Sequence, residues 1–216
     1  MKEYHKINTL WKRDVNGRII EGQYSTPEYE YLKNSQWVWT EKVDGTNIRV
    51  DFNGAKNILF AGRTDKAEIP NFLLNKLQEL FTQDDLIATF ADSSKDMFSV
   101  TLYGEGYGYK IQKNGKNYKA DGVDFVLFDV LVNDILWLKR EDVADIANKL
   151  GIKDVPIIGQ GTLAELNDVV KRGMTSTWGN FAAEGIVARP TIELKDRSGN
   201  RIITKLKHKD FEGIYA

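Results

Sequence analysis

The sequence predicts an α+β fold with mostly antiparallel strands and helices at the periphery. Short runs in which apolar and polar residues alternate occur along the chain, and this period of two is typical of strands. Turn-forming pairs such as Asp44-Gly45 punctuate these runs. Helical spacing of apolar residues appears in a few segments that also carry helix start and stop residues.

The first half of the chain carries these signals after residues 1–34, to which the sequence assigns no role. Pro70 is favoured in a first helical turn, and leucines follow it at helical spacing. The glycine-rich run 104–108 is not expected to form a regular element. Strands are expected at about 36–42, 47–52, 58–61 and 98–103, and helices at 70–81 and 84–90.

The second half combines one strongly apolar strand with two well-marked helices. The first helix ends at Gly151, and the second begins with the capping box Thr162-Leu163-Ala164-Glu165 and stops at Gly173. Helices are expected at about 140–150 and 162–173, and strands at 123–132, 155–158, 184–194 and 201–208.

Composition narrows the class of protein. A chain of 216 residues suits one domain over residues 1–216. The absence of cysteine excludes disulfides and thiolate sites, and His5 and His208 lie too far apart in sequence to suggest a multi-histidine metal site. No apolar run resembles a signal peptide or a membrane span, so we expect a soluble, cytoplasmic protein, with a monomer favoured.

Charge is unevenly distributed along the chain, although the formal net charge is −1. Lysine and arginine dominate residues 195–209, and residues 107–122 contain four lysines but one aspartate. Tyrosines lie among the lysines of 107–119, so this stretch is a candidate for stacking on a nucleic-acid strand. A solvated basic loop explains the same pattern equally well.

Lys42 stands at the end of the strand 36–42 and directly before the turn Asp44-Gly45. This placement fixes the backbone of the lysine and suits a nucleophile. An ordinary hairpin with an exposed lysine has the same local sequence, so the tetrad Lys42-Val43-Asp44-Gly45 is a hypothesis that needs support from the rest of the chain.

Lys205 and Lys207 are expected to share one face of a strand, because residues i and i+2 point to the same side. Two adjacent ammonium groups repel each other unless an anion lies between them, and a triphosphate or a nucleic-acid phosphate would serve. The alternative is an edge strand whose lysines deter aggregation.

Four more residues are candidates for binding. Glu105 and Glu184 are each next to a glycine in the sequence, and glycine permits close approach of a ligand or metal. Arg63 follows a strand and could clamp a phosphate, and Phe128 could stack on a base. Taken singly, each is better explained as an ordinary residue: the glutamates and Arg63 as solvated surface residues and Phe128 as a core residue.

As a set, these motifs resemble those of the covalent nucleotidyltransferases, a superfamily that contains ATP-dependent DNA and RNA ligases and mRNA capping enzymes. The RNA ligase branch is the most similar. The matching motifs are Lys42-Val43-Asp44-Gly45, Tyr103-Gly104-Glu105-Gly106, Phe128-Asp129-Val130, Glu184-Gly185-Ile186-Val187 and Lys205-Leu206-Lys207. The resemblance implies an adenylation-domain fold and an ATP-dependent RNA ligase involved in RNA repair.

The resemblance also implies roles for single residues. Lys42 would form a covalent lysyl-AMP, Lys205 and Lys207 would contact the α-phosphate, and Glu184 would help to bind Mg²⁺ or Mn²⁺. These cations would favour the neutral amine of Lys42 and stabilise charge that develops on phosphate. The implied nucleotide site comprises Glu41, Asp44, Gly45, Thr46, Asn47, Arg63, Glu105, Phe128, Glu184, Lys205 and Lys207, with Phe128 stacked on adenine and Arg63 and Glu105 holding ribose or phosphate.

Other functions remain compatible with the residues. Only residues 210–216 follow the basic run, so no C-terminal OB domain is expected, which disfavours a DNA ligase or a capping enzyme. A minimal DNA ligase, a guanylyltransferase, an adenylyltransferase for another substrate and an inactive nucleotide- or RNA-binding module stay as alternatives. The expected partner is RNA, including a nicked duplex or an RNA–DNA hybrid.

Overall fold

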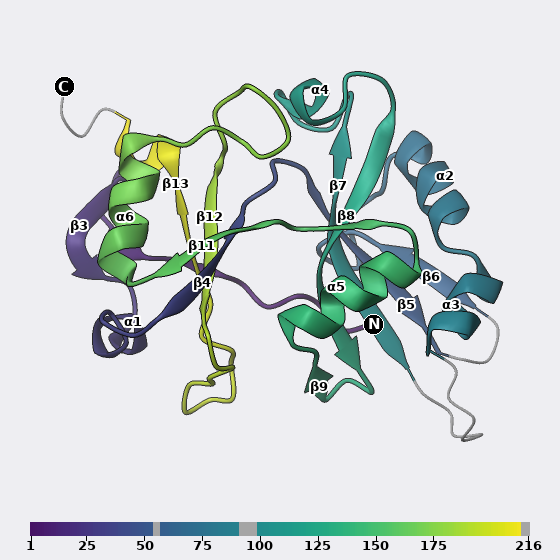
Figure 1. Cartoon of the computed structure of the whole chain (residues 1–216), viewed down its shortest axis with the longest axis horizontal. Coiled ribbons are helices and arrows are strands. Elements are labelled where there is room, and N and C mark those ends of the chain that lie inside the picture. The colour runs from purple at the N-terminus through teal and green to yellow at the C-terminus, as the bar shows by residue number, and fades with distance from the viewer. Residues whose placement is uncertain (54–56, 91–98, 213–216) are drawn as a thin grey trace. The chain divides into compact units, whose positions relative to one another are not determined.

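The computed structural model describes residues 1–53, 57–90 and 99–212. The chain forms two compact units, and Figure 1 labels most of their helices and strands. Unit 1 comprises Met1–Tyr4 and Asp44–Val155, and unit 2 comprises His5–Val43 and Pro156–Ala216. No helix among the described residues has the length and apolar character that crossing a membrane requires.

Unit 1 is built on a six-stranded sheet with β7 near its centre. Its strands are β5 (Thr46–Phe52), β6 (Ile58–Ala61), β7 (Val100–Gly108), β8 (Val123–Val132), β9 (Leu136–Trp137) and β10 (Lys153–Asp154). The order is β10-β8-β7-β5-β6, and β9 pairs with β8. The β5–β7 and β7–β8 pairs are antiparallel, whereas β10 runs parallel to β8.

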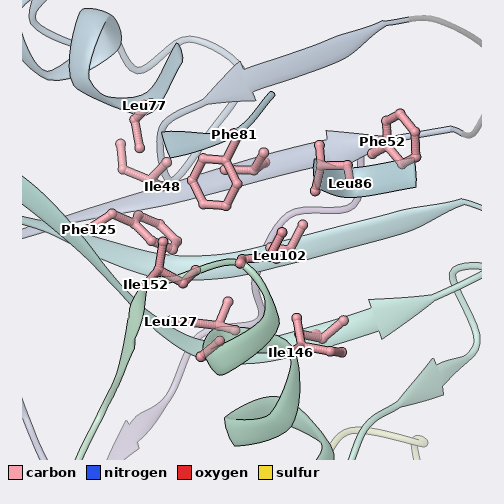
Figure 2. Close-up of a cluster of buried hydrophobic side chains, with 14 of the residues drawn as sticks. Ile48, Phe52, Leu77, Phe81, Leu86, Leu102, Phe125, Leu127, Ile146 and Ile152 are labelled. Atoms are coloured by element: carbon pink, nitrogen blue, oxygen red, sulfur yellow. The ribbon is translucent and has the colours of Figure 1, made fainter. Parts of the chain in front are cut away.

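One face of this sheet packs against helices. The helices of unit 1 are α2 (Asn71–Leu80), α3 (Gln83–Phe90), α4 (Gly115–Tyr118) and α5 (Arg140–Lys149). Figure 2 shows how Leu77 of α2, Leu86 of α3 and Ile146 of α5 join one hydrophobic cluster with side chains of the sheet, including Phe125 and Leu102. The alternation of apolar residues along each strand therefore sets which face is covered.

The expectation that residues 104–108 would be irregular was wrong, because β7 continues through Gly108. A Cβ atom at Gly104 would lie 2.1 Å from Cζ of Phe125, and one at Gly106 would lie 2.7 Å from Cδ2 of Leu73. The glycines thus let a ring and a helix side chain pack directly onto the strand. Pairing with both β5 and β8 satisfies its backbone.

Unit 2 contains a five-stranded sheet and a separate hairpin. Its strands are β1 (Asn8–Thr9), β2 (Trp11–Arg13), β3 (Ile19–Tyr24), β4 (Trp37–Glu41), β11 (Ile157–Gly161), β12 (Gly185–Pro190) and β13 (Thr204–Lys207). The sheet order is β1-β13-β12-β4-β11, and β2 pairs with β3. The helices are α1 (Pro27–Tyr31), α6 (Leu163–Arg172) and the 3₁₀ helix η1 (His208–Phe211).

The core of unit 2 lies between its sheet and α6. Leu163, Leu166 and Val170 of α6 pack in one buried cluster with Trp37 of β4 and Leu206 of β13. The predicted capping box at Thr162 is present, and Gly173 ends the helix with a φ of 78°. Local sequence signals therefore fixed both ends of this helix.

Several strand boundaries differ from expectation. The strand expected at 155–158 is instead β10 and β11, separated at Val155-Pro156, since proline cannot donate a hydrogen bond to a sheet. The long strand expected at 184–194 ends at Pro190. The first residue of the strand expected at 98–103, Phe98, lies outside the described residues.

Candidate active site

Lys42 lies immediately after β4, as the sequence predicts. Its backbone N–H donates to the carbonyl oxygen of Gly185 at 2.9 Å, which fixes it beside the start of β12. A Cβ atom at Gly185 would lie 2.2 Å from the carbonyl oxygen of Leu206, so glycine permits the close approach of β12 and β13. The backbone of Lys42 is therefore held by neighbouring strands of unit 2.

The side chain of Lys42 is paired with a carboxylate. Its Nζ atom lies 2.7 Å from Oε2 of Glu184, while Nζ of Lys207 lies 2.6 Å from Oε1 of the same residue. The side chains of Lys42, Glu184 and Lys207 are 21%, 13% and 24% exposed. One partly buried carboxylate thus holds two ammonium groups that are 165 positions apart in sequence.

Strand pairing brings these groups together. Gly185 pairs with Lys207 in the β12–β13 ladder, and the N–H of His208 donates to the carbonyl oxygen of Glu184 at 2.9 Å. Lys205 and Lys207 are half-buried while Thr204 and Leu206 are fully buried, so the two lysines share a face as strand alternation predicts.

The charge environment of Lys42 differs in one respect from the expectation. Sequence reasoning placed cations beside Lys42, which would favour its neutral amine, but the structure places the Glu184 carboxylate in contact with it. A neighbouring negative charge favours the ammonium form. In this arrangement the Nζ atom of Lys42 is held by the Glu184 carboxylate.

Glu41, the last residue of β4, is buried and fully engaged in hydrogen bonds. It accepts from the hydroxyl of Ser176, from the backbone N–H of Thr177 at 2.8 Å and from the hydroxyl of Thr177 at 2.7 Å. Its side chain thus anchors the loop before β12. Sequence reasoning missed Ser176 and Thr177, since no local pattern marks partners 135 and 136 residues away.

In unit 1, the turn after Lys42 is held by hydrogen bonds from a distant segment. The N–H of Asp44 donates to the hydroxyl oxygen of Tyr118 at 3.2 Å, and the side-chain amide of Gln112 donates to the carbonyl oxygen of Gly45 at 3.0 Å. A Cβ atom at Gly45 would lie 2.3 Å from the carbonyl oxygen of Gly106. Glycine is therefore required at this turn.

Thr46 and Asn47 begin β5 and face the glycine-rich part of β7. Thr46 pairs with Gly106 and Asn47 pairs with Glu105, which makes Asn47 and Glu105 direct neighbours across the sheet. The side-chain oxygen of Asn47 is buried and has no hydrogen-bond partner within the described residues. A buried acceptor in this state is expected to receive a donor from a ligand or from water.

Phe128 is the extra residue of a β-bulge in β8. Tyr103 pairs with Asp129 and Gly104 pairs with Leu127, which leaves Phe128 between them. The ring of Phe128 is partly exposed and lies edge-on to Tyr4 with 5.1 Å between centroids, and the Tyr4 hydroxyl donates to the buried Asp129 at 2.6 Å. Leu127 and Val130 belong to the helix-covered cluster whereas Phe128 does not, and the bulge leaves Phe128 without a partner in β7.

Arg63 lies exposed in the loop that follows β6. The fully buried Arg49 supports this loop, because its guanidinium donates to the carbonyl oxygen of Gly62 and to Asp65, each at 2.8 Å. Sequence reasoning missed Arg49, although a charged residue inside an alternating strand was a signal for it.

The structure thus brings Lys42, Glu184 and Lys207 into contact in unit 2 and places Asn47 beside Glu105 in unit 1. No group of three or more histidine, aspartate or glutamate residues in the described ranges could hold a metal ion by itself. A single carboxylate between two lysines at the end of a strand suits a site that receives an anion.

Comparisons with known proteins agree with the motif order. The RNA ligase family model matches residues 35–207. Comparison with the curated proteins gives no match.

Solved structures of RNA ligases share the fold. A Naegleria gruberi RNA ligase mutant with ATP and Mn is 20% identical at a TM-score of 0.62, over 97% of this chain and 64% of that chain. The same organism's RNA ligase with pyrophosphate is 21% identical at a TM-score of 0.62, over 96% and 62%. An archaeal ATP-dependent RNA ligase is 18% identical at a TM-score of 0.64, over 98% and 49%.

At these low identities the structural similarity establishes the fold alone. It confirms the predicted nucleotidyltransferase architecture of antiparallel sheets with peripheral helices. The chain spans less than two thirds of the length of each of these proteins.

Proposed function

Because the chain belongs to the RNA ligase family, we propose that it is an ATP-dependent RNA ligase that joins a 5′-phosphate end to a 3′-hydroxyl end. The observation that carries this proposal is the contact of Lys42 with Glu184, which also holds Lys207. A nucleophile, a carboxylate and a phosphate-binding cation thereby meet at the end of β4.

In the first step, ATP is the substrate and Lys42 is the nucleophile. The neutral Nζ atom attacks the α-phosphorus, a P–N bond forms, the bond to the bridging oxygen breaks and pyrophosphate leaves with that oxygen. Lys42 loses its protons to solvent in forming the phosphoramidate. The product is AMP attached covalently to Lys42.

Lys207 and Lys205 stabilise the charge that develops on the α-phosphate in this step. Both ammonium groups project from one face of β13, and Lys207 is already held by Glu184 beside Lys42. An α-phosphate between Lys42 and Lys207 takes over the role that Glu184 has in the free protein, which separates Lys42 from its carboxylate.

Glu184 is the residue that fits a divalent metal ion. One carboxylate together with nucleotide phosphates is a donor set that Mg²⁺ takes readily, and Mn²⁺ accepts the same oxygens. The carboxylate of Glu184 is partly buried between two lysines, so a metal ion can replace one of their ammonium groups as its partner. When bound, the metal supplies positive charge to the phosphates.

The remaining nucleotide contacts are proposed for unit 1. The partly exposed ring of Phe128 stacks on adenine. The buried side-chain oxygen of Asn47, next to Glu105, accepts a hydrogen bond from the nucleotide. Arg63 is exposed and available to ribose or phosphate oxygens. Asp44, Gly45 and Thr46 shape the turn, and Glu41 fixes the loop at Ser176 and Thr177 in unit 2.

Two further steps complete ligation. An oxygen of the RNA 5′-phosphate attacks the phosphorus of lysyl-AMP, the P–N bond breaks and Lys42 takes up protons again. The 3′-hydroxyl oxygen then attacks the 5′-phosphorus, AMP leaves and the hydroxyl proton passes to solvent.

We propose that the RNA includes nicked duplexes or RNA–DNA hybrids, that the protein acts as a monomer, and that it serves RNA repair in the cytoplasm.

The test is the intact mass of the protein after incubation with ATP and Mg²⁺, with GTP and NAD in parallel. We expect a gain of one AMP with ATP, and no gain in Lys42→Ala. Lys33→Ala, which removes an exposed lysine of the same unit, is the matched control and should label fully. No adduct in folded, initially unadenylylated protein would refute the proposal, as would labelling of Lys42→Ala.

A further inference from the structure

A hollow of about 530 Å³ in unit 1 lies between α2 and the segment 109–123. Phe72, Lys76 and Glu79 line it from α2, and Tyr109, Lys110 and Asp121 line it from the segment. This volume lies within the range of small-molecule sites and is large enough for a nucleotide. We call it the α2 groove.

Two large rings are exposed in the α2 groove. Phe72 is 42% exposed and Tyr109 is 46% exposed, although aromatic side chains of this size are usually covered in a folded chain. Every nucleobase has a π-face, and exposed rings in a groove provide the surface on which unpaired bases stack. The rings therefore suit a base of a single strand.

The charges around the groove favour phosphate. Nζ of Lys110 lies 5.3 Å from the centre of the Tyr109 ring. Nζ of Lys76 pairs with Oε2 of Glu79 at 3.1 Å, whereas no carboxylate of the described residues forms an ion pair with Lys110. The exposed Lys113 follows on the same segment. Lys110 and Lys113 thus offer ammonium groups for a phosphate backbone, against one further lining acid, Asp121.

The segment that forms one wall of the groove also contacts the turn after Lys42. Lys110 and Gln112 have φ values of 67° and 57°, a left-handed conformation that is unfavourable for such residues. Gln112 then donates to the carbonyl oxygen of Gly45. The segment that lines the groove is therefore also hydrogen-bonded to the motif turn.

We propose that the α2 groove binds an unpaired nucleotide of the RNA strand, with the base stacked against Phe72 and Tyr109 and the phosphate on Lys110. This inference rests on the proposed function for the identity of the strand. It adds a site for RNA outside the residues that handle ATP, and it predicts that RNA affinity and nucleotide chemistry are separable.

The test measures binding of a fluorescently labelled single-stranded RNA with a 5′-hydroxyl end, which cannot accept AMP. Phe72→Ala and Tyr109→Ala should each weaken binding by roughly 5- to 150-fold, the usual effect of losing one stacking ring. Tyr109→Phe should bind like the unaltered protein. Tyr31→Ala removes a ring that is 89% exposed elsewhere and should also leave affinity unchanged.

The mass gain with ATP, measured on the same variants, separates the two proposals. Weakened RNA binding with full adenylylation supports the groove. Unchanged RNA affinity in both alanine variants, an equal loss in Tyr31→Ala, or no RNA binding by the unaltered protein would overturn the groove and leave the ligase proposal standing. Loss of adenylylation in Phe72→Ala or Tyr109→Ala would also overturn the groove, since the rings would then serve the nucleotide step. Absence of adenylylation in the unaltered protein would refute the ligase proposal itself.

Discussion

Glu184 determines the charge balance around Lys42. Both of its carboxylate oxygens pair with lysines, and its side chain is largely shielded from solvent. Bringing two ammonium groups together without a negative charge between them costs free energy, and more so where water is partly excluded. The Glu184 carboxylate therefore lies between the two lysines in the structure.

Replacing Glu184 with glutamine tests this role at the scale of one side chain. Glutamine keeps the shape but carries no charge, so it can neither hold Lys42 and Lys207 together nor serve a divalent metal. We expect the initial rate of adenylylation, followed by intact mass at saturating ATP and Mg²⁺, to fall roughly 100-fold.

Glu30→Gln is the matched control for this substitution, because it removes an exposed carboxylate from α1 in the same unit. Its rate should equal that of the unaltered protein. A Glu184→Gln variant that forms the adduct as fast as the control would exclude the proposed role of the carboxylate.

At the scale of elements, α6 is the helix whose two ends carry the clearest capping residues in the sequence. The N–H of Glu165 donates to the Thr162 hydroxyl at 3.3 Å, and the N–H of Thr162 donates to the Glu165 carboxylate at 2.8 Å. Three of its apolar residues then fall in the core of unit 2. Local capping and burial therefore favour the same helix.

Removing the cap should lower stability by a predictable amount. Thr162→Ala loses the acceptor for the N–H of Glu165, so we expect the free energy of unfolding to fall by about 1 kcal/mol in urea denaturation. Thr162→Ser retains the hydroxyl and should stay close to the unaltered protein. Equal stability of the alanine and serine variants would show that the cap contributes nothing.

The same cap carries a pH dependence. Hydrogen bonds from the backbone N–H and the hydroxyl of Thr162 lower the pKa of Glu165 below its usual value. A group whose pKa is lower in the folded state stabilises that state above its unfolded pKa, near 4.3, and loses the effect as pH falls through the folded pKa. The stability difference between the unaltered protein and Glu165→Gln should therefore shrink below about pH 4.

At the scale of the whole molecule, each unit has its own buried cluster, yet neither is one continuous stretch of chain. The chain passes between the units after Tyr4, Val43 and Val155. Each unit is therefore assembled from separate pieces, and the loop that joins its pieces runs through the other unit.

This connectivity supports the prediction of a single domain, which remains to be tested. Unfolding one unit would release a long flexible loop in the other, with an added cost in closure entropy. We expect one cooperative transition in urea. Tryptophan fluorescence, which reports on Trp11, Trp37, Trp39 and Trp178 of unit 2 and on Trp137 of unit 1, should change together with far-UV circular dichroism. Two separated midpoints would contradict the prediction.

The features that depend on near neighbours along the chain could be predicted from the sequence. Strand alternation predicted the α+β class and the shared face of Lys205 and Lys207, and capping residues predicted both ends of α6. The motif order indicated the family that the comparison then established. These features follow from backbone preferences and side-chain direction over a few residues, which are already present in the unfolded chain.

The contacts that join distant residues became visible in the folded chain alone. Strand register placed Glu184 between Lys42 and Lys207, and a bulge left Phe128 of β8 without a partner in β7. The run 104–108 became a strand because a ring and a helix side chain fill the space beside its glycines. Such outcomes depend on strand pairing between segments that are distant in the sequence and on close packing, neither of which a local pattern specifies.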